Sequence, residues 1–204
     1  MDDGIFIVFD GLDGSGKSTI AKMLQDYLST KKHCDVLVTR EPTDGRYGKE
    51  IRNILANEKN PKDNAEKMLE LFIKDREDHL KNEIIPFLSK KDGKKEVVIC
   101  DRYYYSTIAF QSTQGMDINY LIEKNKGFLK PDIAFIMDIM PEDALERIKN
   151  RKKEKFEQYT FMKELREKFL QMSKLIDDNI KNIDASASSK EVLEQIKEEV
   201  EKII

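Results

Sequence analysis

The chain has 204 residues, of which 39% are hydrophobic and 37% are charged, and its formal net charge is −3. Such a length can bury a sizeable core without disulfides or a structural metal. Because the charge shows no basic excess, we expect small-molecule ligands and no nucleic-acid partner. Cys34 and Cys100 stand alone, which excludes a zinc motif and a disulfide framework. Without a signal peptide or an apolar run of about 18 residues, we expect a cytoplasmic protein with no membrane partner.

Apolar runs alternate with stretches of helical periodicity along the whole chain. Strands are expected at 5–9, 35–39, 97–100, 133–139 and 182–185. Helices are expected from Ser18, at 49–55, 65–88, 106–111 and 118–128, from Pro141, and at 161–178 and 190–203, with Pro86 kinking or ending its helix. Apolar strands separated by helices predict an α/β fold, a five-stranded parallel sheet flanked by helices in three layers. We see no repeat or linker and expect residues 1–204 to form a single domain.

Residues 11–18 read Gly-Leu-Asp-Gly-Ser-Gly-Lys-Ser, the GxxxxGK[ST] pattern, between the first expected strand and the first expected helix. Glycines let backbone N–H groups surround phosphate oxygens, and the helix offers its positive N-terminus. Lys17 supplies a point charge, and Ser18 can ligate Mg²⁺. The pattern predicts a P-loop NTPase fold that binds a nucleoside triphosphate through Gly11, Leu12, Asp13, Gly14, Ser15, Gly16, Lys17, Ser18 and Thr19.

Two charged positions stand out beside this loop. Asp101 follows an apolar strand, as a carboxylate that orients Mg²⁺ or its water shell should, and Arg102 would then face the phosphates as a fork-shaped donor. The alternative for this pair is a surface ion pair. Asp13 is unusual because a carboxylate within a phosphate-binding loop repels the groups that the loop binds. A donor on the ligand must therefore compensate for it.

Three more segments accompany the P-loop in a recognisable order: Thr-Arg-Glu-Pro at 39–42, Leu-Phe-Ile-Lys-Asp-Arg at 71–76, and Asp-Arg-Tyr-Tyr-Tyr-Ser-Thr-Ile-Ala-Phe-Gln at 101–111. With Gly-Leu-Asp-Gly-Ser-Gly-Lys-Ser-Thr at 11–19, they resemble the thymidylate kinase family over essentially the whole chain. The resemblance implies transfer of the γ-phosphoryl group of ATP to dTMP, which gives dTDP and ADP. It also implies Mg²⁺ as the cofactor and a homodimer, which apolar residues on several faces of 65–88 also suggest.

The resemblance implies roles for five residues around the acceptor nucleoside. Asp13 would hold the sugar 3′-hydroxyl, although a solvated loop aspartate is the alternative. Phe72 and Arg76, at i and i+4 on one helical face, would stack on thymine and donate to its carbonyl; taken alone, Phe72 is more simply read as a core residue. Thr107 would lie against the pyrimidine edge. Phe110 would lie against the deoxyribose, where it excludes a 2′-hydroxyl sterically but offers no phenolic hydrogen bond.

The same resemblance implies how charge is neutralised during phosphoryl transfer. Lys17 and Mg²⁺ would act on the donor phosphates, and Arg102 on the acceptor phosphate and the γ-group. Because Gly14 occupies the P-loop position where some relatives carry a late arginine, a lid near 147–160 must provide it. Arg151 is the leading candidate, so the expected catalytic residues are Asp13, Lys17, Arg102 and Arg151.

The loop after Pro42 reads Thr-Asp-Gly, where bacterial relatives have a glycine-led sequence. This departure weakens the assignment of an acceptor-phosphate arginine, for which Arg40 and Arg52 both remain candidates. Other functions also remain open at this point. A deoxynucleoside kinase or another nucleoside monophosphate kinase would share these motifs. A non-catalytic P-loop switch is less favoured, because the chain has no Asn-Lys-x-Asp motif and no Asp-x-x-Gly sequence after Asp101.

Overall fold

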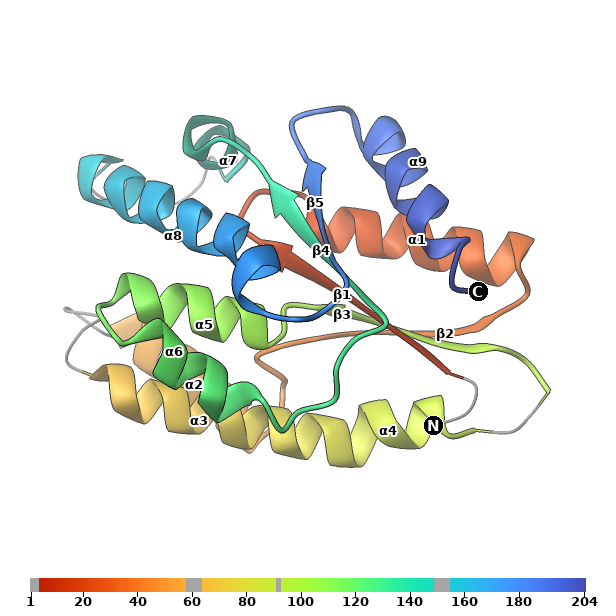
Figure 1. Ribbon diagram of the computed structural model, residues 1–204, viewed down its shortest axis with the longest axis horizontal. Helices are drawn as coiled ribbons and strands as arrows, with labels where there is room; N and C mark the ends of the chain where they lie inside the picture. Colours follow the sequence, from red (N-terminus) through yellow and green to blue (C-terminus); the bar gives the residue numbers. More distant parts are fainter. Residues whose placement is uncertain (1–3, 58–63, 91–92, 149–154) are drawn as a thin grey trace.

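The computed structural model describes residues 4–57, 64–90, 93–148 and 155–204. Its centre is a parallel sheet of five strands in the order β2-β3-β1-β4-β5, with helices on both sides (Figure 1). The strands are β1 (Ile5–Gly11), β2 (Asp35–Arg40), β3 (Glu96–Asp101), β4 (Ile133–Asp138) and β5 (Ile180–Asp184). This arrangement confirms the predicted α/β class.

The helices form two layers that cover the sheet. In Figure 1, α1 and α9 lie on one side of the strands, and α2 to α6 lie on the other side. Helix α8 packs along α5. The helices are α1 (Lys17–Lys31), α2 (Arg46–Asn57), α3 (Ala65–His79), α4 (Ile85–Leu88), α5 (Tyr104–Thr113), α6 (Ile118–Asn125), α7 (Pro141–Arg147), α8 (Lys155–Leu175) and α9 (Ser189–Val200).

The three central strands supply the core. Every residue of β1 is buried, and in β3 and β4 only the last residue is partly exposed. Strands buried on both faces need helices on both sides, which explains their almost continuous apolar sequence. Phe9 and Phe135 stack across β1 and β4 with their ring centroids 5.3 Å apart. The register places Phe9 beside Asp101 and Arg40 beside Asp101, so the carboxyl ends of β1, β2 and β3 meet at one edge.

The helix expected at 65–88 is divided. Helix α3 ends at His79, a π-helical turn covers Leu80–Ile84, and α4 follows. The backbone N–H of Ile85 donates to the carbonyl of Leu80, five residues earlier. Pro86 has no N–H and its ring crowds the preceding turn, and the wider π turn lies directly before it. The proline therefore interrupts the α-helix in the turn before its own position, at Leu80–Ile84.

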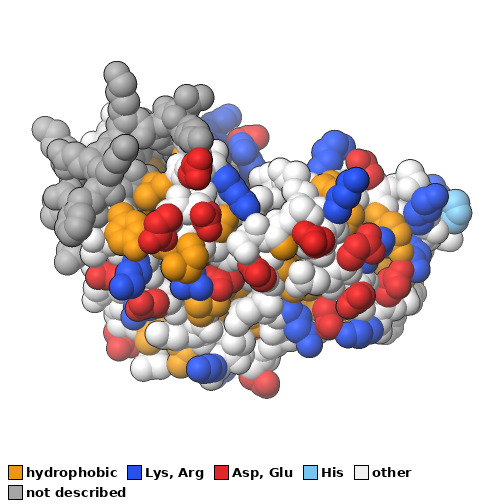
Figure 2. Space-filling model, turned by 90° about the horizontal axis from the view of Figure 1, so that it is seen from above, with side chains coloured by type: hydrophobic (Ala, Val, Ile, Leu, Met, Phe, Trp, Pro, Cys, Tyr) orange, Lys and Arg blue, Asp and Glu red, His pale blue; other side chains and the backbone are white. Residues whose placement is uncertain are grey.

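Two other boundaries differ from expectation. Helix α8 begins at Lys155 and ends at Leu175, where 161–178 was expected, because Lys, Glu and Gln before 161 are good helix formers. Strand β5 covers 180–184 where 182–185 was expected, because its pairing with β4 begins at Ile180 opposite Ala134. On the face shown in Figure 2, acidic and basic side chains are interspersed, in keeping with the small net charge.

We predict that Gly48→Ala destabilises the fold by about 1–3 kcal/mol through overpacking. A Cβ atom at Gly48 would lie 1.9 Å from the carbonyl oxygen of Thr43. Thr43 has little freedom to retreat, because its backbone N–H and its hydroxyl donate to the two oxygens of Asp75 at 2.8 and 2.6 Å. Chemical denaturation measures the loss. The control is Gly127→Ala, where a Cβ meets nothing within 4 Å; equal stabilities of the two variants would contradict the prediction.

Candidate active site

The P-loop joins β1 to α1 at the carboxyl edge of the sheet. Two of its glycines are required by close backbone approach. A Cβ at Gly11 would lie 2.6 Å from the carbonyl oxygen of Met137, and one at Gly14 would lie 2.5 Å from that of Ala144. Gly14 also has a φ of +83°, in the left-handed region that favours glycine. The packing of Gly14 against α7 therefore leaves no space for a side chain at this position of the loop.

Lys17 is the buried cation of the P-loop. Its Nζ donates to the carbonyl oxygens of Leu12 at 2.7 Å and Gly11 at 3.1 Å. Burial, and after it the neighbouring charge of Arg102, lower the pKa of Lys17 to about 8, although the carboxylates of Asp101, Asp13 and Asp10 oppose the shift. An anion bound to the loop would place negative charge beside this ammonium and would therefore raise the pKa of Lys17.

Ser18 and Asp101 come together as the sequence predicts. The hydroxyl of Ser18 donates to Oδ2 of Asp101 at 2.5 Å. The other oxygen, Oδ1, is buried and accepts no hydrogen bond from the described residues. Among these residues there is no group of three His, Cys, Asp or Glu side chains that could hold a metal ion by itself. A hydroxyl and one carboxylate fit Mg²⁺, which binds few protein oxygens and takes its remaining ligands from phosphates and water.

Arg102 donates to Asp13 from within the protein, where the sequence analysis expected a donor on the ligand. Its backbone has a φ of +75°, rare for a residue with a side chain, and its N–H donates to the carbonyl of Phe9 at 2.8 Å. Its guanidinium donates to Asp13 at 2.6 Å, to the hydroxyl of Ser106 at 2.8 Å and to the carbonyl of Gly11 at 3.1 Å. The P-loop is therefore tied to the end of β3 by this arginine.

Asp10 is a site residue that the sequence analysis missed. Its buried carboxylate accepts the backbone N–H groups of Tyr103 at 3.0 Å and Ser106 at 3.2 Å, together with the hydroxyl of Ser106. These contacts satisfy the first turn of α5. Burial raises the pKa of Asp10, and the charge of Arg102 and the hydrogen bonds oppose this shift. A carboxylate at the end of an all-apolar strand is the signal that could have identified it.

A mainly apolar cavity of about 280 Å³ lies beside the P-loop. It brings Phe72, Arg76 and Phe110 together, as predicted. The rings of Phe110 and Phe161 meet edge to face at 5.3 Å, so α8 forms one wall. Thr107 does not line the cavity: its hydroxyl accepts a hydrogen bond from Nη2 of Arg76 at 3.0 Å. The described residues that line it are Leu12, Asp13, Glu41, Pro42, Leu55, Phe72, Arg76, Arg102, Tyr103, Ser106, Phe110, Ile148, Phe161, Met162, Leu165 and Phe169.

Arg76 is fixed by a buried hydrogen-bond network. Its Nε and Nη2 donate to the same oxygen of Glu41 at 2.9 and 2.7 Å, and its Nη1 donates to Oδ1 of Asn125 at 2.7 Å. The side chains of Arg76 and Glu41 are 1% and 4% exposed, so this ion pair is shielded from water. Glu41 lies in the Thr-Arg-Glu-Pro segment, which could have marked it, whereas no sequence signal identifies Asn125.

A second cleft, of about 960 Å³, holds the P-loop residues and the candidate phosphate arginines. Arg40 and Arg52 both line it, and both contact Oδ1 of Asp44, Arg40 at 3.5 Å and Arg52 at 2.9 Å. Arg147 also lines it and donates to the carbonyl of Ala185 at 3.0 Å. Arg151, the expected lid arginine, lies outside the described residues.

The two cavities adjoin. Asp13, Glu41, Pro42, Leu55 and Arg102 line both of them. A P-loop with a buried lysine, a hydroxyl and carboxylate pair suited to Mg²⁺, and an adjoining nucleoside-sized cavity with a fixed arginine define a P-loop kinase acting on a small acceptor.

The thymidylate kinase family model matches residues 9–196. The chain belongs to the thymidylate kinase family, whose members are ATP-dependent phosphotransferases. A probable thymidylate kinase of Pyrococcus horikoshii is 45% identical over 151 residues, which cover 72% of this chain and 71% of that protein. A probable thymidylate kinase of Archaeoglobus fulgidus is 37% identical over 202 residues, covering 98% and 94%.

A thymidylate kinase of Desulfotalea psychrophila is 42% identical over 145 residues, covering 71% of this chain and 68% of that protein. These relatives confirm the family that the motifs indicate and do not favour the deoxynucleoside kinase, the other monophosphate kinases or the switch protein. Among the described residues, no helix is both long enough and apolar enough to cross a membrane.

We predict that ATP affinity depends on the protonation of Lys17. Its pKa is about 8 without ligand, and bound phosphate stabilises the protonated form. The Kd for MgATP should therefore be constant below that pH and rise by up to about tenfold per pH unit above it. Calorimetric titration from about pH 6.5 to about 9.5 tests this, with Lys17→Met as the control that removes the dependence. A wild-type Kd that stays constant across the range would contradict the prediction.

Proposed function

We propose that the protein transfers the γ-phosphoryl group of ATP to dTMP across these two adjoining cavities. The observation that carries the proposal is the shared boundary: Asp13 and Arg102 line both the phosphate cleft and the nucleoside cavity. A donor in one and an acceptor in the other would meet there. Phosphoryl transfer requires this placement, with its charges neutralised, more than it requires covalent chemistry by the protein.

The nucleobase is recognised by Arg76 and Phe72 under this proposal. A guanidinium has five N–H donors and no acceptor. The described bonds of Arg76 use one on Nε, one on Nη1 and two on Nη2, which leaves one on Nη1. A fixed donor suits the carbonyl of thymine or uracil and opposes the exocyclic amine of cytosine. Phe72 supplies a ring for stacking, and Thr107 acts by holding Arg76.

The sugar and acceptor phosphate lie at the shared boundary. Asp13 accepts from the 3′-hydroxyl, and Phe110, whose ring meets Phe161, leaves no polar partner for a 2′-hydroxyl. Arg40 and Arg52 bind the acceptor phosphate, which would replace Asp44 as their anionic partner. Phosphate oxygens accept bidentate bonds from guanidinium groups, so this exchange strengthens the contact.

Mg²⁺ is held by Ser18 and Asp101, whose buried Oδ1 is the free acceptor in the described structure. When bound, the metal neutralises charge on the donor phosphates. Lys17 binds the donor phosphates, Arg102 contacts the transferring group, and Arg151 arrives from a lid near 147–160. The clash that excludes a side chain at Gly14 supports a lid donor.

The chain acts as a single domain, in a homodimer, in the cytoplasm, with ATP and dTMP as its small-molecule ligands.

We predict that ADP release with MgATP depends on the acceptor. dTMP should support rapid release, dUMP should be disfavoured by about 1–3 kcal/mol for its missing methyl group, and dCMP should be rejected because its amine opposes Arg76. A coupled assay across the common nucleoside monophosphates, with thymidine included, measures the order. Turnover of dCMP or thymidine at the dTMP rate, or release independent of any acceptor, would contradict the proposal.

We predict that Arg151→Ala lowers kcat by about 10³ or more and leaves the Kd for dTMP nearly unchanged, because the lid arginine acts in the transition state. Lys153→Ala is the matched control, because a hydrated ammonium lacks the planar fork that spans two phosphoryl oxygens. Single-turnover rates measure both variants. If Arg151→Ala stays within a few-fold of wild type, the donor must be sought at Arg147, which lines the phosphate cleft.

A further inference from the structure

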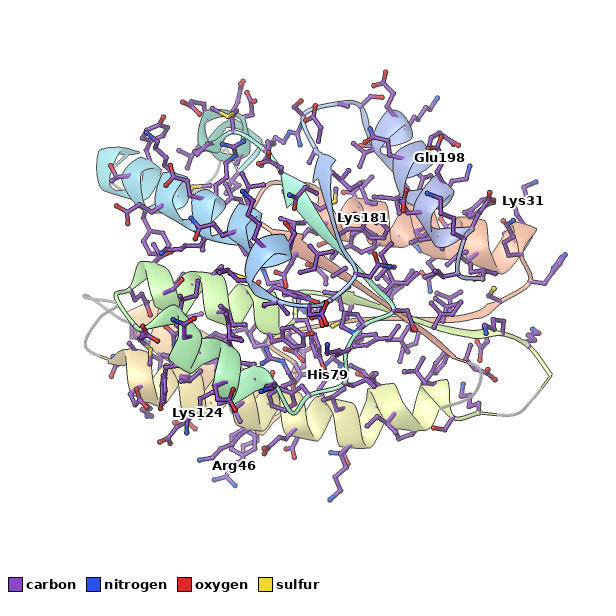
Figure 3. The ribbon with its side chains drawn as sticks, viewed as in Figure 1. Lys31, Arg46, His79, Lys124, Lys181 and Glu198 are labelled. Carbon is purple, nitrogen blue, oxygen red and sulfur yellow. The ribbon has the colours of Figure 1, made fainter. Side chains whose placement is uncertain are left out.

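His79 lies at the end of α3, in the interior of the protein, with its side chain 1% exposed. Figure 3 labels it between α3 and the sheet, whereas Lys31 and Arg46 project from the surface. Nothing in the proposed chemistry uses this imidazole. Burying such a group is costly unless its nitrogens are hydrogen-bonded, so its partners indicate its role.

Both ring nitrogens of His79 have partners, on opposite sides of the ring. Nδ1 lies 3.2 Å from Oε1 of Glu41. Nε2 lies 2.8 Å from the hydroxyl of Thr39 and 3.0 Å from Oε2 of Glu83. A carboxylate oxygen accepts and does not donate, so the hydrogen in the contact with Glu41 belongs to Nδ1.

Glu41 divides its two oxygens between two partners. Oε2 accepts from Nε and Nη2 of Arg76, and Oε1 faces His79. A carboxylate bound through one oxygen alone can rotate about its last torsion, which is broad and poorly restricted. The N–H of His79 fixes the second oxygen and so fixes the plane of the carboxylate. Two donors of Arg76 meet one oxygen of this carboxylate, so its fixed plane helps to orient the guanidinium, together with the bonds to Asn125 and Thr107.

We propose that His79 is a positioning residue for nucleobase recognition: through Nδ1–H it holds Glu41 in the orientation that presents Arg76 to the nucleoside cavity. The inference rests on the proposed role of Arg76. The contacts on the Nε2 side connect the ring to β2 and to the half-exposed Glu83, and they do not lead to the cavity. The two nitrogens therefore have separable roles, and only the Nδ1 side serves substrate binding.

Two substitutions of His79 test the roles of its two ring nitrogens separately. His79→Asn retains an amide donor near the position of Nδ1, and His79→Gln places its amide near that of Nε2. We expect His79→Gln to raise the KM for dTMP by about tenfold, the effect of losing one hydrogen bond to a charged group. We expect His79→Asn to stay within about twofold of wild type. The KM for ATP and the kcat should change little in both variants, since the described contacts of His79 reach none of Lys17, Ser18 and Asp101.

Controls distinguish positioning from general stability. His33→Asn changes the exposed histidine and should leave all constants at wild-type values. Glu83→Gln alters only the Nε2 side, at a half-exposed residue whose replacement leaves the core intact, and should leave the KM for dTMP unchanged. A several-fold rise with Glu83→Gln would overturn the proposal even if the His79 variants were too unstable to assay.

Arg76→Gln tests the basis of the inference separately. If it leaves the KM for dTMP unchanged, the proposed nucleobase site is wrong. If it raises that KM while His79→Gln does not, the site stands and the role of His79 is overturned. Equal losses in His79→Asn and His79→Gln would also overturn it, because a purely structural histidine does not distinguish its two nitrogens.

Discussion

The structure depends on two cations, Lys17 and Arg102, that line one cleft at the carboxyl edge of the sheet. Their proximity is unfavourable, because burial and the charge of Arg102 together lower the pKa of Lys17. Asp10, Asp13 and Asp101 oppose this effect, and each comes from the end of a central strand or the loop after it. The parallel register brings these groups together, and bound phosphates would complete the balance of charge.

A second constraint connects the phosphate side of the cleft to the nucleoside side. Adjacent residues of α3 hold the loop after β2, since Asp75 binds Thr43 and Arg76 binds Glu41. Arg52 donates to the carbonyl of Pro42, between these two anchors, at 2.9 Å. The arginines proposed for the acceptor phosphate and the nucleobase are therefore parts of one framework. This arrangement favours precise placement of the acceptor, on which the rate of phosphoryl transfer depends.

The sequence predicted the strands, the P-loop and the pairing of Ser18 with Asp101 because these features follow from local periodicity and from where parallel strands end. For Asp13 it predicted a donor on the ligand and missed the protein donor, Arg102. Asp10, Asn125 and His79 were missed because their partners lie far along the chain, as with Asp10 and Tyr103. The π-helical turn was missed because a proline marks an interruption without specifying its form.

The central claim is that one cleft holds donor and acceptor together, with Asp13 and Arg102 at the junction. Calorimetric titration with adenosine and thymidine joined through their 5′-oxygens by a polyphosphate chain tests it most directly. The account predicts one ligand per chain, bound more tightly than ATP or dTMP alone and displacing both, because linking two ligands makes the second contact intramolecular. A ligand that displaces only ATP, and leaves dTMP free to bind beside it, would contradict a continuous cleft.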